Sequence, residues 1–283
     1  MIVRNIFRCS RLLYGLVFEP MDAVITIDVE RLYPGAEKGT YQFLSLLHNS
    51  GIKGTFFITG DVISHCPEIV NQIVKAGHEI ASHGFSHPGH PDNFQLPYLM
   101  DLDLDEAREE IRRSKQVFRQ YGYNARGFRA PGFRIKKEFL NIVGQYFEYD
   151  SSIVNSFFPG DKYKRLPRVP SKIGNVLEIP VSNLNLCRIP LGTPYFLALG
   201  PIWLIKLLKW LGTTNPIILY FHCFDLVGLN NQALPHSRFK KKWYFEKCGP
   251  KNIYFFESLF SFLLERGIRF RTCQEISEDL KEA

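Results

Sequence analysis

Short apolar runs alternate with amphipathic segments along most of the chain. The apolar runs are rich in Val, Ile, Leu and Phe. Short apolar runs of this kind are typical of strands buried in a parallel sheet. We predict strands over residues 21–27, 54–59, 78–82, 126–130, 149–153, 176–181, 216–222 and 268–271.

The segments between these runs have the period of helices. In residues 67–76, for example, the apolar side chains of Ile69, Val70, Ile73 and Val74 fall on one helical face. Glycines follow several of these segments and indicate where the helices end. We predict helices over residues 40–50, 67–76, 104–121, 136–147, 200–211 and 252–266.

This alternation predicts the fold class. Strands that alternate with helices form parallel β/α units. Seven or eight such units in one chain favour a closed barrel over an open sheet, and no internal repeat or linker divides the chain. We predict an α/β fold, a distorted (β/α)7-type barrel, with one catalytic domain over residues 21–283.

The first twenty residues do not follow this pattern. Residues 12–18 are apolar but short for the core of a signal peptide, and Glu19 and Pro20 follow in place of a small-residue cleavage site. No later run reaches the roughly 18 apolar residues that span a bilayer. We therefore expect residues 1–20 to be an N-terminal arm that is disordered or outside the fold, in a cytoplasmic protein without signal peptide or transmembrane helix.

The composition and charge of the chain indicate which kinds of partner the protein could bind. The chain has 283 residues, 45% of them hydrophobic, and a formal net charge of +7. A basic surface attracts nucleic acid, acidic polysaccharide or anionic lipid, but a solvated basic face is the more frequent reason for such a charge. We expect no nucleic-acid partner. Peripheral membrane contact stays open, because the predicted helix 200–211 carries Trp203, Lys206, Lys209 and Trp210 among leucines. Packing against the barrel is the favoured alternative for that helix.

The cysteines indicate a reducing compartment. The six are irregularly spaced, and no two form a C-x-x-C pair. We expect free thiols. They are Cys9, Cys66, Cys187, Cys223, Cys248 and Cys273.

Titratable side chains follow several predicted strands. Reactive groups of parallel barrels gather at the carboxyl ends of the strands. Asp28 and Glu30 are two residues apart and therefore point to one side of their strand. His83 and His87 alone are weak evidence, but one carboxylate and two imidazoles complete the protein ligands of an open zinc site. The second carboxylate is then free to act as a base. The remaining candidates at strand ends are Arg129, Asp150 and His222.

These residues lie in motifs that resemble the polysaccharide deacetylases, metal-dependent esterases and amidases of carbohydrates. The motifs stand in the family's order over most of residues 21–275. They are TIDVE (26–30), GTFFI (54–58), HEIASHGFSH (78–87), GFRAP (127–131), YDSS (149–152), LEIP (177–180) and YFH (220–222).

The resemblance implies a metal site and a base. Glu30, His83 and His87 would bind a divalent metal, Zn²⁺ in the first instance, with Co²⁺, Ni²⁺ or Mn²⁺ as alternatives. Asp28 would be the general base, and Arg129 would hold it oriented and ionised. The chain departs from the adjacent aspartates of many members, since it has Asp-x-Glu. We associate that form with a subgroup from exopolysaccharide loci.

The resemblance also implies a residue that acts as the general acid. His222 would be the general acid, and Asp150 would orient it. Asp225 lies close to His222 in the sequence and is the alternative orienting residue.

Substrate-binding residues are expected in two places. Pro131 belongs to the arginine motif. PLGTPYF (190–196) resembles the Gly- and aromatic-containing loop of the exopolysaccharide subgroup. Aromatic faces stack on sugar rings, so Tyr195 or Phe196 could carry the sugar. Core packing is the alternative for both.

The resulting hypothesis is an enzyme that hydrolyses a linear amide bond. It would remove an N-acetyl group from an amino sugar of a surface polysaccharide or its precursor, which could be lipid-linked. Its partner would be a carbohydrate with an N-acylated amino sugar. The alternatives are a deformylase of a lipid-linked amino sugar, an amidohydrolase of a small cyclic amide, and an inactive carbohydrate-binding protein.

Overall fold

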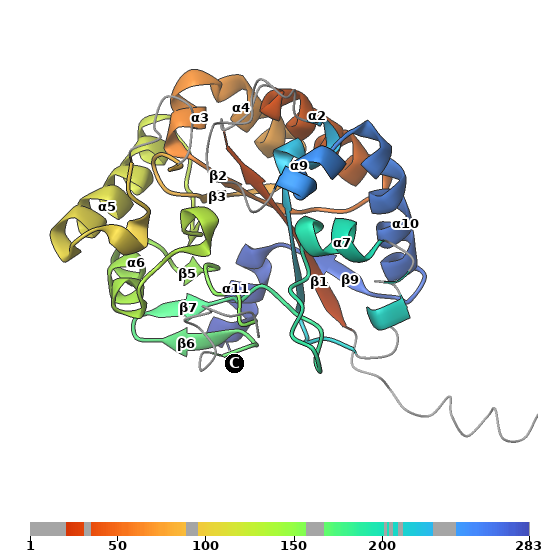
Figure 1. Ribbon diagram of the computed structural model, residues 1–283. Helices are drawn as coiled ribbons and strands as arrows, with labels where there is room; N and C mark the ends of the chain where they lie inside the picture. The colour runs from red at the N-terminus through yellow and green to blue at the C-terminus, as the bar shows by residue number, and fades with distance from the viewer. Residues whose placement is uncertain are drawn as a thin grey trace, which may run out of the picture.

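Nine strands form the centre of the molecule in the computed structural model of the chain (Figure 1). The structure describes residues 21–30, 35–88, 96–156, 167–200, 203, 206–208, 212–228 and 242–282. The expected N-terminal arm, residues 1–20, lies outside them. The strands are β1 Asp22–Val29, β2 Thr55–Ile58, β3 Glu79–Ser82, β4 Gly127–Phe128, β5 Tyr149–Asp150, β6 Ser171–Ile173, β7 Val176–Glu178, β8 Ile217–His222 and β9 Arg269–Arg271.

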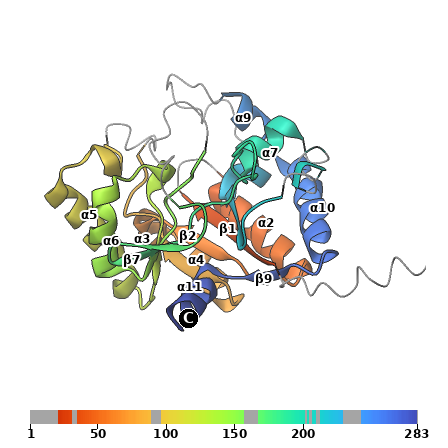
Figure 2. The same cartoon turned by 90° about the horizontal axis from the view of Figure 1, so that it is seen from below.

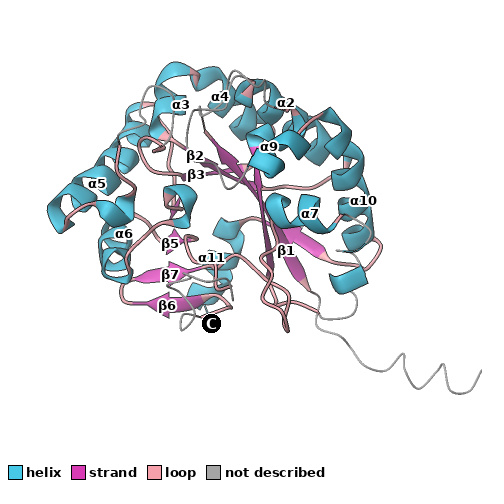
Figure 3. Cartoon of the chain, in the orientation of Figure 1, coloured by secondary structure: helices cyan, strands magenta, loops and turns pink. Residues whose placement is uncertain are grey.

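Helices surround these strands (Figure 3). They are α2 Ala36–Asn49, α3 Gly60–His65, α4 Pro67–Lys75, α5 Leu104–Gln120, α6 Leu140–Tyr146, α7 Thr193–Leu199, α9 Lys242–Lys247, α10 Ile253–Leu264 and α11 Cys273–Glu282. Four of them differ from the sequence-based expectation. The stretch expected as a loop at 190–196 contributes to α7, and α3, α9 and α11 lie where no helix was expected. None of the described helices combines the length and the apolar character needed to cross a bilayer.

The sheet curls into a distorted barrel, which confirms the predicted fold class. Its order is β6-β7-β5-β4-β3-β2-β1-β8, and every pair except β6 with β7 is parallel. Among the residues that the structure describes, no regular strand closes the sheet between β7 and β8. Residues 181–192 bridge that gap instead, through bonds such as Ser182 N–H to the carbonyl of Ile218 and Tyr220 N–H to that of Leu191.

The strands separate two cores because successive side chains point to opposite faces. On β1, Ile25, Ile27 and Val29 pack outward against the helices, whereas Val24 belongs to a smaller cluster inside the barrel. The inner cluster also contains Phe57, Ala81, Tyr149, Ile179, Ile218, Cys273 and Ile276.

One end of the barrel is closed by α11. Its first residues donate hydrogen bonds to the first residues of β2 and β3. Cys273 N–H donates to Thr55 Oγ1 and Gln274 N–H donates to Glu79 Oε2, both at 2.9 Å. Figure 2 shows α11 at one end of the strands and α7 and α9 at the other. The carboxyl ends of the strands are therefore left for the site.

Candidate active site

The inward alternation of the strands gathers the candidate residues at one end of the barrel. Asp28 lies near the end of β1 and Glu30 directly follows the strand, on the same face as Val24 and Thr26. Asp28 pairs in register with His222 of β8. His83 follows β3, and its Nε2 lies 3.9 Å from Asp28 Oδ2. The structure thus brings residues almost 200 positions apart in the sequence into one site.

Glu30, His83 and His87 form a group that could hold a metal. Their candidate ligand atoms all lie within 4.8 Å of one another, and all three residues are buried. Glu30 Oε1 lies 3.4 Å from His83 Nε2 and 3.5 Å from His87 Nε2. Neighbouring ligands of a tetrahedral zinc site, each about 2.1 Å from the metal, are about 3.4 Å apart. The separations therefore fit a metal of this size.

The hydrogen bonds of the two histidines fix their tautomers. Nδ1 of His83 lies 2.9 Å from the carbonyl of Arg129, and Nδ1 of His87 lies 2.7 Å from that of Pro88. A carbonyl only accepts, so each Nδ1 carries a proton and donates it. Each Nε2 then presents a lone pair toward Glu30. Nε2 of His83 is buried and has no hydrogen-bond partner, as expected of a nitrogen that serves as a metal ligand.

The electrostatics favour an ionised Glu30. Burial raises the pKa of its carboxyl, but His87 and His83 lower it, and the pKa falls to about 2. A carboxylate and two imidazole nitrogens form a donor set that suits zinc and related divalent ions.

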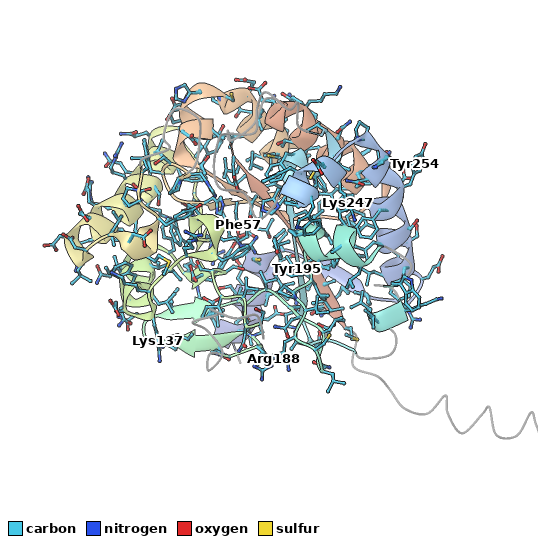
Figure 4. The ribbon with its side chains drawn as sticks, in the orientation of Figure 1. Phe57, Lys137, Arg188, Tyr195, Lys247 and Tyr254 are labelled. Atoms are coloured by element: carbon cyan, nitrogen blue, oxygen red, sulfur yellow. The ribbon has the colours of Figure 1, made fainter. Side chains whose placement is uncertain are left out.

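Asp28 is held by a fully buried arginine. Arg129 donates from Nη1 to Asp28 Oδ1 and to Thr26 Oγ1, both at 2.8 Å. Its other donors reach the carbonyl and hydroxyl of Ser151. The guanidinium also lies 4.0 Å from the ring centre of Phe57, toward the middle of the molecule in Figure 4. One oxygen of Asp28 is thereby fixed, and Oδ2 faces His83.

His222 is oriented by residues from the loop and helix that follow β8. Its Nδ1 lies 3.0 Å from the hydroxyl of Tyr244, and that hydroxyl donates to Asp225 Oδ1 at 2.6 Å. The other oxygen of Asp225 accepts the backbone N–H of His222 and the hydroxyl of Thr193. Tyr244 and Thr193 were not predicted as partners of His222 from the sequence, since no spacing rule links them to that residue.

The expectation that Asp150 orients His222 is wrong for this structure. Asp150 pairs in register with Phe128, whose side chain packs in the outer core, so its own side chain also leaves the barrel interior. Its carboxyl accepts from Ser152 and lies within hydrogen-bond reach of Glu178. Asp225, the alternative, contacts His222 instead.

The three residues that were expected to bind the sugar lie in different environments. Phe196 is fully buried and packs on Phe221 and Phe255, so it is a core residue and the prediction of a sugar platform is wrong. Tyr195 is half-buried and lies toward the centre of Figure 4, and it stays a candidate. Pro131 is buried, with its ring close to Gly84. Its substrate contact stays a prediction.

The family model described as polysaccharide deacetylase matches residues 19–147 of the chain. Over these residues, which make up less than half of the chain, the sequence is similar to the polysaccharide deacetylase family. The match contains Asp28, Glu30, His83, His87 and Arg129, whereas His222 lies beyond it.

Several curated relatives with similar segments are named as deacetylases of peptidoglycan. A peptidoglycan-N-acetylglucosamine deacetylase of Bacillus cereus is 31% identical over 93 residues, 32% of this chain and 30% of that protein. A peptidoglycan deacetylase of Helicobacter pylori is 30% identical over 158 residues, 53% of this chain and 49% of that protein. The chain thus matches half or less of the length of these relatives.

Solved structures share the fold over nearly the whole chain. A Mycobacterium smegmatis protein described as a polysaccharide deacetylase aligns with a TM-score of 0.60 at 20% identity, covering 95% of this chain and 93% of that one. A pseudoenzyme of carbohydrate esterase family 4 from Bacillus anthracis aligns with a TM-score of 0.56 at 15% identity, covering 92% and 66%. Because a pseudoenzyme has this fold, activity has to be argued from the site.

Proposed function

We propose that this protein is a metal-dependent hydrolase that removes the N-acetyl group from an amino sugar. The carrying observation is the unpartnered Nε2 of buried His83, which lies 3.4 Å from an ionised Glu30 and 3.9 Å from Asp28. Glu30, His83 and His87 would hold the metal, with zinc the first candidate and cobalt, nickel or manganese the alternatives. When bound, such an ion supplies Lewis-acid polarisation of an amide carbonyl and lowers the pKa of water.

The chain's own residues would move the protons. Asp28 would take the proton of the attacking water at Oδ2, because Oδ1 is engaged by Arg129. His222 would deliver a proton from Nε2 to the departing amine, since its Nδ1 is bound to Tyr244. Base and acid lie on neighbouring strands in register, and Asp28, Glu30 and His222 each have a side-chain atom within 4.8 Å of the other two.

The proposed substrate is an N-acetylated amino sugar of a surface polysaccharide or its precursor. The named activities of the relatives, which act on peptidoglycan, support a glycan of this class. The Asp-x-Glu motif supports the exopolysaccharide subgroup, and a lipid-linked precursor belongs to the same proposal.

Peripheral membrane contact would suit a lipid-linked substrate. Trp203 is 64% exposed and has Lys206 beside its ring, and Trp243 is 41% exposed with Lys247 beside its ring. Paired indole and ammonium groups suit an anionic bilayer surface. Sedimentation with anionic vesicles should carry the protein down, whereas zwitterionic vesicles should not. Equal sedimentation with both would contradict a charge-assisted contact.

One assay tests the activity. Metal-stripped protein is reloaded with zinc and incubated with N-acetylglucosamine oligomers, peptidoglycan strands and a lipid-linked N-acetylhexosamine, and acetate and formate are measured. Acetate release that disappears in His83→Ala, but persists in the exposed-residue control His65→Ala, is the expected result. Formate in place of acetate would indicate the deformylase. Metal binding without turnover of any substrate would favour the inactive carbohydrate-binding protein.

A further inference from the structure

A carboxylate from outside the site holds the turn between the two histidines. Glu110 of α5 accepts the backbone N–H of Phe85 at 3.0 Å and that of Ser86 at 3.5 Å, both with Oε1. These residues lie midway between His83 and His87. One side-chain oxygen thus contacts the backbone that connects both histidines.

The opposite side of the turn is held by the start of α3. Gly60 N–H donates to the carbonyl of Gly84 at 3.0 Å, and Asp61 N–H donates to that of Phe85 at 2.9 Å. Carbonyl groups of the turn are therefore bound by α3, and its N–H groups by Glu110. Hydrogen bonds therefore connect the turn to two helices, α3 and α5.

Packing does not replace the contact with Glu110. A cavity of about 280 Å³ borders the turn on this side, and Gly84, Ser86, Pro88 and Glu110 all line it. Gly84 has a φ of +78°, which only glycine adopts without strain. On this side the backbone is therefore positioned by its hydrogen bonds, while the side chain of Phe85 packs on the core.

We propose that Glu110 is a positioning residue for His83 and His87, acting through the backbone of the turn. This inference rests on the proposed function, because it takes these histidines as metal ligands. Ligand atoms have to be placed within about 0.2 Å for tight binding, and partners that orient ligands typically change metal affinity 10- to 100-fold. Glu110 would meet that requirement without touching metal or substrate.

The test is the affinity of the metal-free full-length chain for Co²⁺, measured by titration of the visible absorption, which also reports ligand geometry. Glu110→Ala should weaken binding about 10- to 100-fold and alter the spectrum. Glu110→Gln retains an acceptor oxygen and should stay within a few-fold of the wild type. Glu109→Ala is the matched control, because Glu109 is half-exposed and pairs with Arg112 on the outer face of α5.

The outcomes separate this inference from the proposed function. If the wild type binds no Co²⁺, the proposed metal site itself fails. If the wild type binds and Glu110→Ala binds equally well, only the role of Glu110 is wrong. Loss in Glu110→Gln as large as in Glu110→Ala would also overturn the role as a hydrogen-bond acceptor. Should the alanine variant not fold, Glu110→Asp, which withdraws the oxygen by one methylene, should still bind more weakly, and wild-type affinity there would refute the inference.

Discussion

The hydroxyl of Tyr244 lies between Nδ1 of His222 and Oδ1 of Asp225, at 3.0 and 2.6 Å. The hydroxyl has one proton and gives it to the carboxylate, so the imidazole donates its Nδ1–H to the hydroxyl oxygen. This fixes the tautomer and leaves Nε2 for chemistry. The proposed acid is thus oriented through a tyrosine from a helix beyond the barrel.

Removing this hydroxyl should weaken catalysis without altering substrate binding. In Tyr244→Phe the Nδ1–H of His222 and the oxygen of Asp225 lose their shared partner. A hydrogen bond of this kind contributes about 1 kcal/mol, so we expect kcat to fall about five- to tenfold with KM unchanged. Steady-state kinetics of acetate release measure this. Tyr254→Phe, at an exposed position near the rim of the molecule in Figure 4, is the control and should behave as the wild type.

The two candidate partners of His222 can be separated by paired substitutions. Asp225→Asn should lower kcat at least tenfold, because it removes the charge next to the imidazole and disturbs bonds to Tyr244 and Thr193. Asp150→Asn should be nearly neutral, since an amide can still accept from Ser152 and can donate to Glu178. Kinetics and urea unfolding of both variants check this. A larger catalytic loss in Asp150→Asn would restore Asp150 as the orienting residue.

The buried pair of Arg129 and Asp28 should be strongly coupled. Arg129→Ala leaves an uncompensated buried carboxylate and should cost about 3–5 kcal/mol of unfolding free energy. Adding Asp28→Asn to that variant removes the orphaned charge, so the double variant should regain part of this loss. Urea unfolding of the metal-free proteins measures the cycle. Additive effects would show that the two charges do not stabilise each other.

Much of the site could be predicted from strand periodicity. The two-residue spacing of Asp28 and Glu30 correctly placed both on one face, and the strand-end positions brought His83 and His222 beside them. The same rule explains the error at Asp150, whose in-register partner Phe128 faces outward. Which face a two-residue strand turns inward depends on its neighbours, so the sequence of the strand alone does not reveal it.

The site residues that lie on helices could not be predicted from the sequence, for a different reason. Tyr244 follows His222 by 22 positions, and Glu110 follows the histidine motif of residues 78–87. Neither separation is a recognisable motif spacing. Their contacts arise from how α9 and α5 pack on the barrel. Phe196 shows the converse, because an aromatic residue in a suggestive loop proved to be part of the core once that loop was a helix.

Glu79 should make the stability of the fold depend on pH. Burial raises the pKa of its carboxyl from 4.5 to about 7, although Tyr149, Thr55 and Gln274 N–H all donate to it. The folded state then binds more protons than the unfolded state between about pH 4.5 and 7. The contribution of Glu79 is therefore complete below pH 4.5 and is lost as the pH rises to 7, by about 3 kcal/mol.

A comparison with Glu79→Gln isolates this effect. The amide resembles the protonated carboxyl, since its oxygen can accept from Thr55 and Gln274 while its nitrogen donates to the hydroxyl of Tyr149. His78 acts in the opposite direction, because burial lowers its pKa to about 4, so the wild-type profile alone is ambiguous. The difference in unfolding free energy between the variant and the wild type should grow in favour of the variant from pH 5 to 7.5. A constant difference over that range would mean that Glu79 stays ionised, held by its three donors at the closed end of the barrel.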